Sequence, residues 1–271
     1  MKKLQMLLVA LMALALPSCM TIDSLITVKP DGSGTLVEKI VLKAAAKEMM
    51  AGLGGIAGEE AGNPLLDEAE YKARAEKLGA EFVSLKQIEG GDEGVEVSYK
   101  FADITKLKFT PSEGMSTGGD DADDDDEEEQ PMTFSFSPGN PAKLTAKLPD
   151  DFHDIQSSAA DAGAGGPGGE GGEEDAAAEA MGAQMMAMMA PMFKDMKMRV
   201  RMRFESEIVD TNATISKDNE VILMFMDFGK IVASEGGLMN LMEMDGSDRE
   251  AINKIPGVKM QLEEEFEVTF K

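Results

Sequence analysis

Residues 196–208 read MKMRVRMRFESEI, and this stretch shows the clearest secondary-structure signal in the chain. Apolar and basic side chains alternate along it, as they do on a β-strand with one buried and one solvated face. The basic side chains are Lys197, Arg199, Arg201 and Arg203. The stretch therefore predicts a strand over 196–208 with its apolar face on the core of a sheet and four cations on the other face.

This basic row has two interpretations. It could bind an anion such as a lipid headgroup. Alternatively, it could pair with Glu263, Glu265 and Glu267, which alternate with the apolar residues of the C-terminal segment. Two neighbouring antiparallel strands would then match a basic row to an acidic row, with about 0.2–1 kcal/mol from each cross-strand pair. The ion-pair ladder is the preferred interpretation, and it predicts that the two strands are neighbours.

Other segments have the patterns of β-hairpins and single strands. The predicted hairpins pair 22–28 with 35–42, 82–88 with 94–101, and 132–136 with 142–148. Each pair is joined by a short segment rich in Gly, Pro, Asp or Asn, which is typical of turns. The segment 220–228 is almost continuously apolar, which favours a strand covered on both faces. A last strand is predicted over 258–270, with its apolar side chains at even positions. Glu264 also has an even position, so we expect this charged side chain at a rim or in a wet pocket.

Two segments between these strands show helical signals. Apolar side chains recur at helical spacing over 42–53, where a group of glycines ends the pattern. The second helix is indicated by Asn63 as N-cap, Pro64 in the first turn and Gly79 after the last turn. Two pairs of opposite charges inside it lie four residues apart, Glu68 with Lys72 and Glu70 with Arg74.

The predicted fold class is α+β, with an antiparallel sheet of about eight or nine strands and three or four helices packed on it. Residues 19–271 are expected to form a single domain, interrupted by disordered inserts at 112–130 and 158–174. The first insert contains nine acids in the ten positions 120–129, and the second is dominated by Gly, Ala and acids. Neither insert can bury enough apolar surface to offset the entropy lost on ordering.

Composition excludes several classes of function. The 271 residues include 26 Lys and Arg against 51 Asp and Glu, a formal charge of −25. Such a charge repels phosphate backbones, so nucleic acid is not an expected partner. A single Cys and a single His leave no internal disulfide, no cysteine-built zinc site and little material for catalysis. We therefore expect neither an enzyme nor a cofactor or metal.

A serine hydrolase is the third reading of the function, and the sequence disfavours it. Residues 114–118 read GMSTG, which matches the nucleophile-elbow pattern, and His153 follows as the only histidine. The elbow needs a strand before it and a helix after it, but PSE precedes this match and an acidic run follows. Nine nearby carboxylates would also destabilise a developing oxyanion.

Methionines form a stripe at helical spacing in the second half of the chain. Met181, Met185, Met188 and Met192 lie at positions i, i+4, i+7 and i+11. Three interpretations remain open: packing inside the protein, an apolar surface for a partner, and a soft thioether site for copper(I). Packing is favoured because no His or Cys lies nearby, and no metal site is assigned.

The first nineteen residues have the pattern of an export signal with a lipid-attachment site. Lys2 and Lys3 precede the mainly apolar run 4–16, which is shorter than the ~20 residues of a membrane-spanning helix. The run ends in LPSC, residues 16–19, and this tetrapeptide resembles the lipobox of bacterial lipoproteins. That resemblance implies a signal peptide over 1–18 and acylation of Cys19, which would anchor the protein to a membrane. The alternative is ordinary cleavage after Ala15, which would leave Cys19 as a free thiol.

Two further resemblances concern the location and role of the mature protein. Met20 stands after Cys19 where Asp would signal retention in the inner membrane, so the sorting rule of Gram-negative lipoproteins implies the outer membrane, facing the periplasm. The opening hairpin, with VKPDGSG at 28–34, resembles the start of the uncharacterised envelope lipoproteins that include the mycobacterial LppM-like proteins. A lipid-binding role is suggested for that group, and the resemblance implies it as an alternative role for this protein.

The leading functional hypothesis is a non-enzymatic, lipid-anchored cell-envelope protein with a structural or protein-interaction role. The alternative is a carrier of lipid or another hydrophobic ligand, held in a cavity lined by Met and Phe. The expected partner beyond the membrane is accordingly another envelope protein or a lipid. A continuous apolar cavity of ~300–1,000 Å³ would favour the carrier, whereas a filled core would favour the interaction protein.

Overall fold

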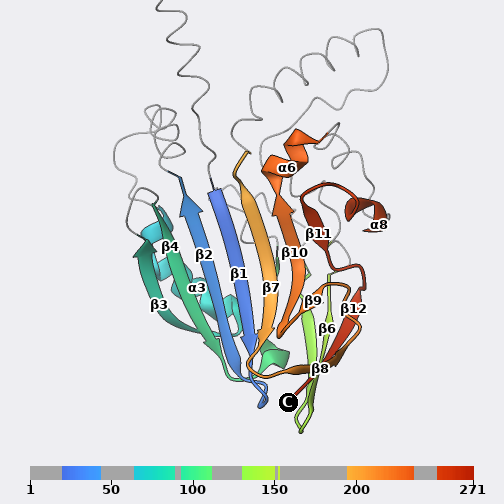
Figure 1. Ribbon diagram of the computed structural model, residues 1–271. Coiled ribbons are helices and arrows are strands. Elements are labelled where there is room, and N and C mark those ends of the chain that lie inside the picture. Colours follow the sequence, from blue (N-terminus) through green and yellow to red (C-terminus); the bar gives the residue numbers. More distant parts are fainter. Residues whose placement is uncertain are drawn as a thin grey trace, which may run out of the picture.

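The computed structural model describes residues 20–43, 64–88, 93–111, 130–149, 152, 194–234 and 249–271. These residues form two β-sheets and a few short helices (Figure 1). The strands of the large sheet are β1 (Met20–Val28), β2 (Gly34–Leu42), β3 (Glu81–Ile88), β4 (Glu93–Phe101), β7 (Lys197–Phe204), β9 (Ser216–Lys217), β10 (Glu220–Asp227) and β11 (Val258–Met260). The small sheet contains β5 (Thr133–Ser137), β6 (Ala142–Lys147), β8 (Ile208–Thr211) and β12 (Glu265–Phe270). The helical elements are α3 (Glu68–Leu78), α6 (Phe228–Ala233), α8 (Arg249–Ile252) and the 3-10 turns η1 (Pro64–Leu66) and η2 (Ile104–Lys106).

The large sheet is mixed, which corrects the prediction of a single antiparallel sheet. Its strand order is β11-β10-β7-β1-β2-β4-β3, with β9 paired to β10, and the small sheet has the order β5-β6-β12-β8. The central pair, β1 and β7, is parallel, whereas the other pairs of the large sheet are antiparallel. A parallel pair needs a long crossover connection, and here most of the chain separates the two strands. The α+β class holds broadly, with strands dominating the described residues.

The three predicted hairpins are confirmed as β1–β2, β3–β4 and β5–β6. In the first turn, the Lys29 amide donates to the Ser33 carbonyl oxygen at 2.8 Å, and the Gly32 amide donates to the Lys29 carbonyl oxygen at 2.9 Å. Gly32 has φ +83°, a left-handed conformation that only glycine adopts without strain. The short-range turn chemistry therefore fixes these pairs locally.

Two segments predicted as single strands each divide between the sheets. The segment 196–208 forms β7 up to Phe204 and then enters β8 at Ile208, and the segment 258–270 forms β11 and then β12. The two layers contact each other next to the first break, where the Phe204 and Phe270 ring centroids lie 4.7 Å apart. Glu264 lies at the second break with its side chain 59% exposed and 2.7 Å from the Arg249 guanidinium. Its expected place at a rim is confirmed.

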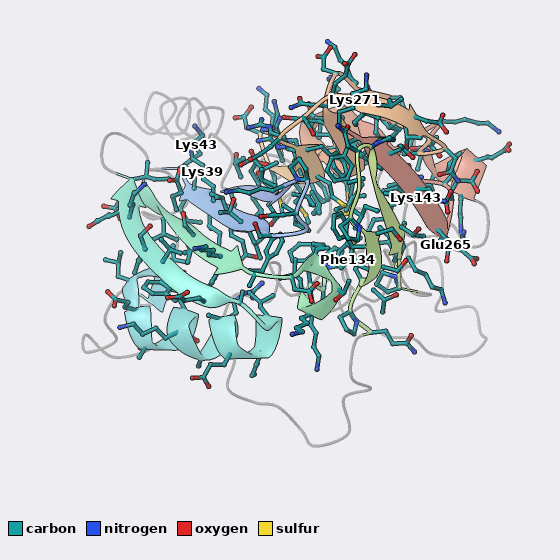
Figure 2. The ribbon with its side chains drawn as sticks, turned by 90° about the horizontal axis from the view of Figure 1, so that it is seen from below. Lys39, Lys43, Phe134, Lys143, Glu265 and Lys271 are labelled. Carbon is teal, nitrogen blue, oxygen red and sulfur yellow. The ribbon has the colours of Figure 1, made fainter. Side chains whose placement is uncertain are left out.

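The core lies between the large sheet and a second layer made by α3 and the small sheet, as the end-on view in Figure 2 shows. The buried side chains of both sheets form one continuous cluster with those of α3 and η2. The strand β10 is buried less completely than predicted, because Ile222 and Phe225 are half-buried on the opposite face. We call that opposite side of the large sheet the outer face. In Figure 1 no helix or strand of the described ranges lies in front of it.

Helix α3 differs in its start and in one charge pair from the prediction. It begins after Asp67, whose Oδ1 accepts from the Ala69 amide at 2.9 Å, while Pro64 belongs to η1. Gly79 ends the helix with φ +69°, as predicted. The Glu68–Lys72 pair is present at 2.6 Å. Arg74 turns toward the sheet and donates to Glu38 on β2 at 2.9 Å, so the predicted pairing of Arg74 with Glu70 is wrong.

Candidate functional site: the outer face of the large sheet

Strand register aligns charged residues in rows across the outer face. Residues that are direct partners on neighbouring strands share one face of a sheet, so a row can be followed from edge to edge. One row crosses seven strands through Lys86, Glu96, Lys39, Asp23, Arg199, Phe225 and Lys259. Charges of alternating sign therefore meet along this row, although they come from distant parts of the sequence.

The basic row of β7 lies in the middle of this face and binds carboxylates of both neighbouring strands. Asp23 on β1 accepts from Arg199 at 2.6 Å and from Arg201 at 3.0 Å. Glu220 on β10 lies 3.3 Å from Arg201 and also accepts from Arg203. The Asp23 and Arg201 side chains are only 15% and 16% exposed. These five residues form the arginine network, a continuous set of charge-assisted hydrogen bonds.

The predicted ladder between this row and Glu263, Glu265 and Glu267 is wrong. The neighbours of β7 are β1 and β10, whereas β12 lies in the small sheet. Glu267 on β12 pairs instead with Lys143 at 2.7 Å. The prediction of which side chains share one face was correct for both strands, but the faces of two strands do not decide whether the strands are neighbours.

Electrostatics favours the ionised forms of Glu220 and Arg201 within the arginine network. Burial alone would raise the pKa of Glu220, but the hydrogen bond from Arg203 and the charges of Arg201 and Arg203 hold that pKa below its usual range. Burial would likewise lower the pKa of Arg201, but hydrogen bonding to Asp23 and the nearby carboxylates raise it above the usual value. The ion pair between Glu220 and Arg201 is therefore favoured at neutral pH.

A Glu220→Gln variant should be less stable at neutral pH by about 1–2 kcal/mol, because it loses charge-assisted hydrogen bonds. A carboxylate with a lowered folded-state pKa contributes stability above its unfolded pKa, and this contribution is lost as the pH falls through the folded value. The difference between wild type and variant should therefore close in acid, as followed by urea unfolding at several pH values. Glu205→Gln is the control, since Glu205 is 48% exposed and 3.8 Å from Lys29. A difference for Glu220→Gln that persists in strong acid would contradict this electrostatic role.

Cations outnumber carboxylates on the whole outer face. Following the rows through all strands gives nine basic residues and five acidic ones, an excess of four positive charges. The basic residues are Lys197, Arg199, Arg201 and Arg203 on β7, with Lys39, Lys86, Lys100, Lys217 and Lys259 on other strands. The acidic residues are Asp23, Glu81, Glu96, Glu220 and Asp227. Sequence reasoning found only the β7 row, because the other lysines occur singly on their strands.

A second polar cluster lies inside the protein between β2, β4 and α3. The Glu38 carboxylate and the Arg74 guanidinium meet at 2.9 Å, with side chains 9% and 23% exposed. Tyr99 is fully buried close to Glu38, yet its hydroxyl makes no hydrogen bond of ordinary geometry with any described residue. Burial raises the pKa of Tyr99, and the charge of Glu38 adds to this effect. The phenol of Tyr99 is therefore neutral at physiological pH.

We expect Tyr99→Phe to leave the free energy of unfolding unchanged or to raise it by about 1 kcal/mol, because it removes a buried hydroxyl that makes no hydrogen bond of ordinary geometry. Tyr71→Phe is the matched control. The Tyr71 hydroxyl donates to the Leu65 carbonyl oxygen at 3.3 Å, so that variant should lose about 0.5–1 kcal/mol. Chemical denaturation of both variants tests the pair, and a large loss for Tyr99→Phe would show that its hydroxyl is bonded.

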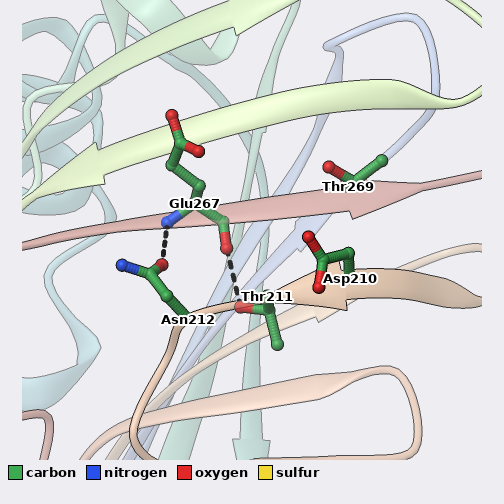
Figure 3. Close-up of a pocket in the computed structure, with 5 residues that line it drawn as sticks. All are labelled: Asp210, Thr211, Asn212, Glu267 and Thr269. Carbon is green, nitrogen blue, oxygen red and sulfur yellow. Dashed lines mark hydrogen bonds between the residues drawn. The ribbon is translucent and has the colours of Figure 1, made fainter.

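A shallow pocket lies on the small sheet, at the edge between β8 and β12 (Figure 3). It has a volume of 210 Å³ and is lined by Asp210, Thr211, Asn212, Glu267 and Thr269. The Thr211 hydroxyl donates to the Glu267 carbonyl oxygen at 2.7 Å, and the Glu267 amide donates to Asn212 Oδ1 at 2.6 Å. These contacts complete the backbone pairing of the sheet edge. The pocket is smaller than the ~300–1,000 Å³ of typical ligand sites.

The remaining sites predicted from the sequence lie outside the described residues. They are Cys19, the stripe Met181, Met185, Met188 and Met192, the motif 114–118 with His153, and the inserts up to Glu129 and over 158–174. Most of the helix predicted over 42–53 lies there too. Within the described ranges, no group of three or more His, Cys, Asp or Glu is placed to hold a metal ion. No helix within those ranges has the length and apolar character needed to cross a bilayer.

Comparisons with known proteins give one structural likeness. No protein-family model matches the chain, and no curated protein sequence matches it. Among solved structures, the chain is similar to the NMR structure of the folded domain of LppM from Mycobacterium tuberculosis. The two share 11% sequence identity with a TM-score of 0.35, over 94% of this chain and 92% of that chain.

Proposed function

We propose that the protein is a non-enzymatic, lipid-anchored component of the bacterial cell envelope whose sheet domain serves as an interaction surface at the membrane. The observation that carries this proposal is the position of the attachment site. The first described strand, β1, begins at Met20, directly after Cys19. Acyl chains on Cys19 would hold the start of a central strand of the large sheet at the bilayer, without an intervening linker.

Lipid attachment is sufficient to hold such a domain. Each buried methylene contributes ~0.8 kcal/mol, and two or more long acyl chains give a stable anchor without a spanning segment. The nine residues of β1 extend ~30 Å, so every position along this strand lies within ~30 Å of the anchored residue. The anchor therefore determines where the domain acts, and the sheet determines what it contacts.

The packing of the core supports an interaction protein over a carrier. The methionines and phenylalanines that a carrier would place around a ligand are packed against one another between the two layers. Met202, Met260, Phe204, Phe266 and Phe270 are all 0% exposed and belong to one continuous cluster. The interior formed by the described residues is filled, which leaves their surface as the part that can bind.

The anchor is tested with a Cys19→Ser variant of the full chain, expressed in a bacterium that processes lipoproteins. The wild-type protein should fractionate with membranes, and mass spectrometry of its N-terminal peptide should show an acylated Cys19. Cys19→Ser should abolish membrane fractionation almost completely. Ser18→Gly is the control, because a small residue before the cysteine preserves the lipobox. A wild-type N-terminus at Leu16 with a free thiol would overturn the proposal.

The role of the domain is tested on protein purified from its native membrane. A co-purifying envelope protein at stoichiometric amount is the expected result for an interaction surface. One lipid molecule retained per chain after delipidation would instead identify a carrier and overturn this part of the proposal.

A further inference from the structure

The outer face of the large sheet differs in charge from the protein as a whole. It carries an excess of four positive charges in a chain of net charge −25. At physiological ionic strength charges are screened beyond ~8 Å, whereas packed layers lie ~10 Å apart. An anion close to the outer face therefore interacts mainly with the cations of this face and only weakly with the acids elsewhere.

Several of these cations are available for an external anion. Lys39, Lys100, Lys217 and Lys259 are exposed, and none of them forms an ion pair with another described residue. Lys39 lies on the side of the sheet away from α3, as Figure 2 shows. Arg199 and Arg203 retain 43% and 41% exposure although they belong to the arginine network. The face therefore presents basic groups across almost its full width.

Apolar side chains lie between these cations. One row of the outer face contains the half-buried side chains of Val37, Leu25 and Ile222, with Arg201 of the arginine network between Leu25 and Ile222. The row beside it contains Phe225. An apolar stripe flanked by basic side chains suits the boundary of a bilayer, where aliphatic groups enter and cations stay with the headgroups.

We propose that the outer face binds the surface of an anionic lipid bilayer. The proposal rests on the proposed function, because the anchor at Cys19 brings this face to the membrane. At ~3.3 Å per residue, the row of Asp23 and Arg199 lies ~13 Å from the anchored residue, and the row of Thr27 and Arg203 lies ~26 Å from it. A tether at the end of a central strand thus lets the whole face lie on the headgroups.

The test uses lipidated protein in vesicles of phosphatidylcholine, with and without phosphatidylglycerol. A spin label is placed on the outer face by Ser98→Cys, and on α3, in the second layer, by Ala73→Cys. We expect phosphatidylglycerol to protect the label at position 98 several-fold from a water-soluble nickel reagent, while the label at 73 stays accessible. High salt should remove this protection, because it screens charge.

Matched lysine variants test whether charge on this face is responsible. Lys39→Gln, Lys100→Gln and Lys217→Gln are combined in an outer-face triple. Lys77→Gln, Lys106→Gln and Lys108→Gln form the control triple, with the same change of charge on exposed residues of α3, η2 and the segment after η2. Each basic residue near an anionic surface contributes about fivefold to binding, so the outer-face triple should weaken membrane contact on the order of 100-fold. The control triple should keep it.

Equal accessibility of position 98 in both kinds of vesicle would overturn the proposal, and so would equal effects of the two triples. Protection that requires an added acidic protein instead of phosphatidylglycerol would overturn it as well.

Failure of the proposed anchor is distinguished from failure of this proposal. A chain that is not lipidated would not enter either vesicle, and mass spectrometry detects the missing acyl chains separately. In that case co-sedimentation of the soluble full chain with phosphatidylglycerol vesicles compares the same two triples. Equal binding by both would again overturn the proposal.

Discussion

Replacing Phe204 by alanine should lower the free energy of unfolding by about 3–5 kcal/mol, the range for loss of a fully buried aromatic side chain. Phe204 is 0% exposed and ends β7 at the point where the chain leaves the large sheet for the small one. Its ring centroid lies 4.7 Å from that of Phe270, the last residue of β12. The cavity left by Phe204→Ala would therefore separate the two sheets at the corner that joins them.

Equilibrium unfolding in urea measures this effect, with two variants for comparison. Phe204→Leu retains most of the apolar volume and should lose only about 1–2 kcal/mol. Val209→Ala changes a residue of β8 that is 51% exposed and should stay within about 0.5 kcal/mol of wild type. If Phe204→Ala and Val209→Ala were equally stable, the two layers would not be packed as the structure has them.

The parts of the fold that could be predicted from the sequence are those set by neighbours along the chain. Turn residues between two alternating segments fix a hairpin locally, and β1–β2, β3–β4 and β5–β6 were all predicted in this way. Gly79 likewise marked the end of α3, because a left-handed residue stops a helix whatever surrounds it. Local chemistry decides these features, so a single sequence contains enough information for them.

The parts that could not be predicted depend on contacts between distant segments. Parity placed the arginines of β7 on one face, but nothing in residues 196–208 indicates that β1 lies beside them in parallel. Asp23 is a single acid in an otherwise uncharged strand, so it gave no signal as the partner of two arginines. The breaks after Phe204 and Met260 were missed for a similar reason. Apolar side chains recur at even positions on both sides of each corner, while the partner strand changes from one sheet to the other.

The candidate site shows the same division between local and distant information. The sequence singled out four cations of the outer face because they follow one another on β7. Lys39, Lys100 and Lys259 join them only through the register of β2, β4 and β11. A charge surface assembled from single residues on many strands becomes visible only when strand order and register are known.

Gly34→Ala should also destabilise the protein severely, by about 3 kcal/mol or more, although it adds a single methyl group. Gly34 begins β2 and lies between Val28 on β1 and Phe101 on β4. A Cβ at this position would overlap the carbonyl oxygen of Thr27 and stand 2.5 Å from Cζ of Phe101. The Thr27 oxygen belongs to a strand paired on both sides, so it cannot move without breaking the ladder at the centre of the sheet.

The need for glycine at this position is steric, because Gly34 does not have a positive φ. Thr35→Ala is therefore an informative control: it changes the next residue of β2, on the outer face, and should cost at most about 1 kcal/mol. Thermal and urea unfolding of both variants compares position 34, where the strands are closely packed, with the open position 35. Gly34→Ala would contradict the β1–β2–β4 packing if it unfolded with the wild-type midpoint, since three strands meet too closely there to admit a side chain.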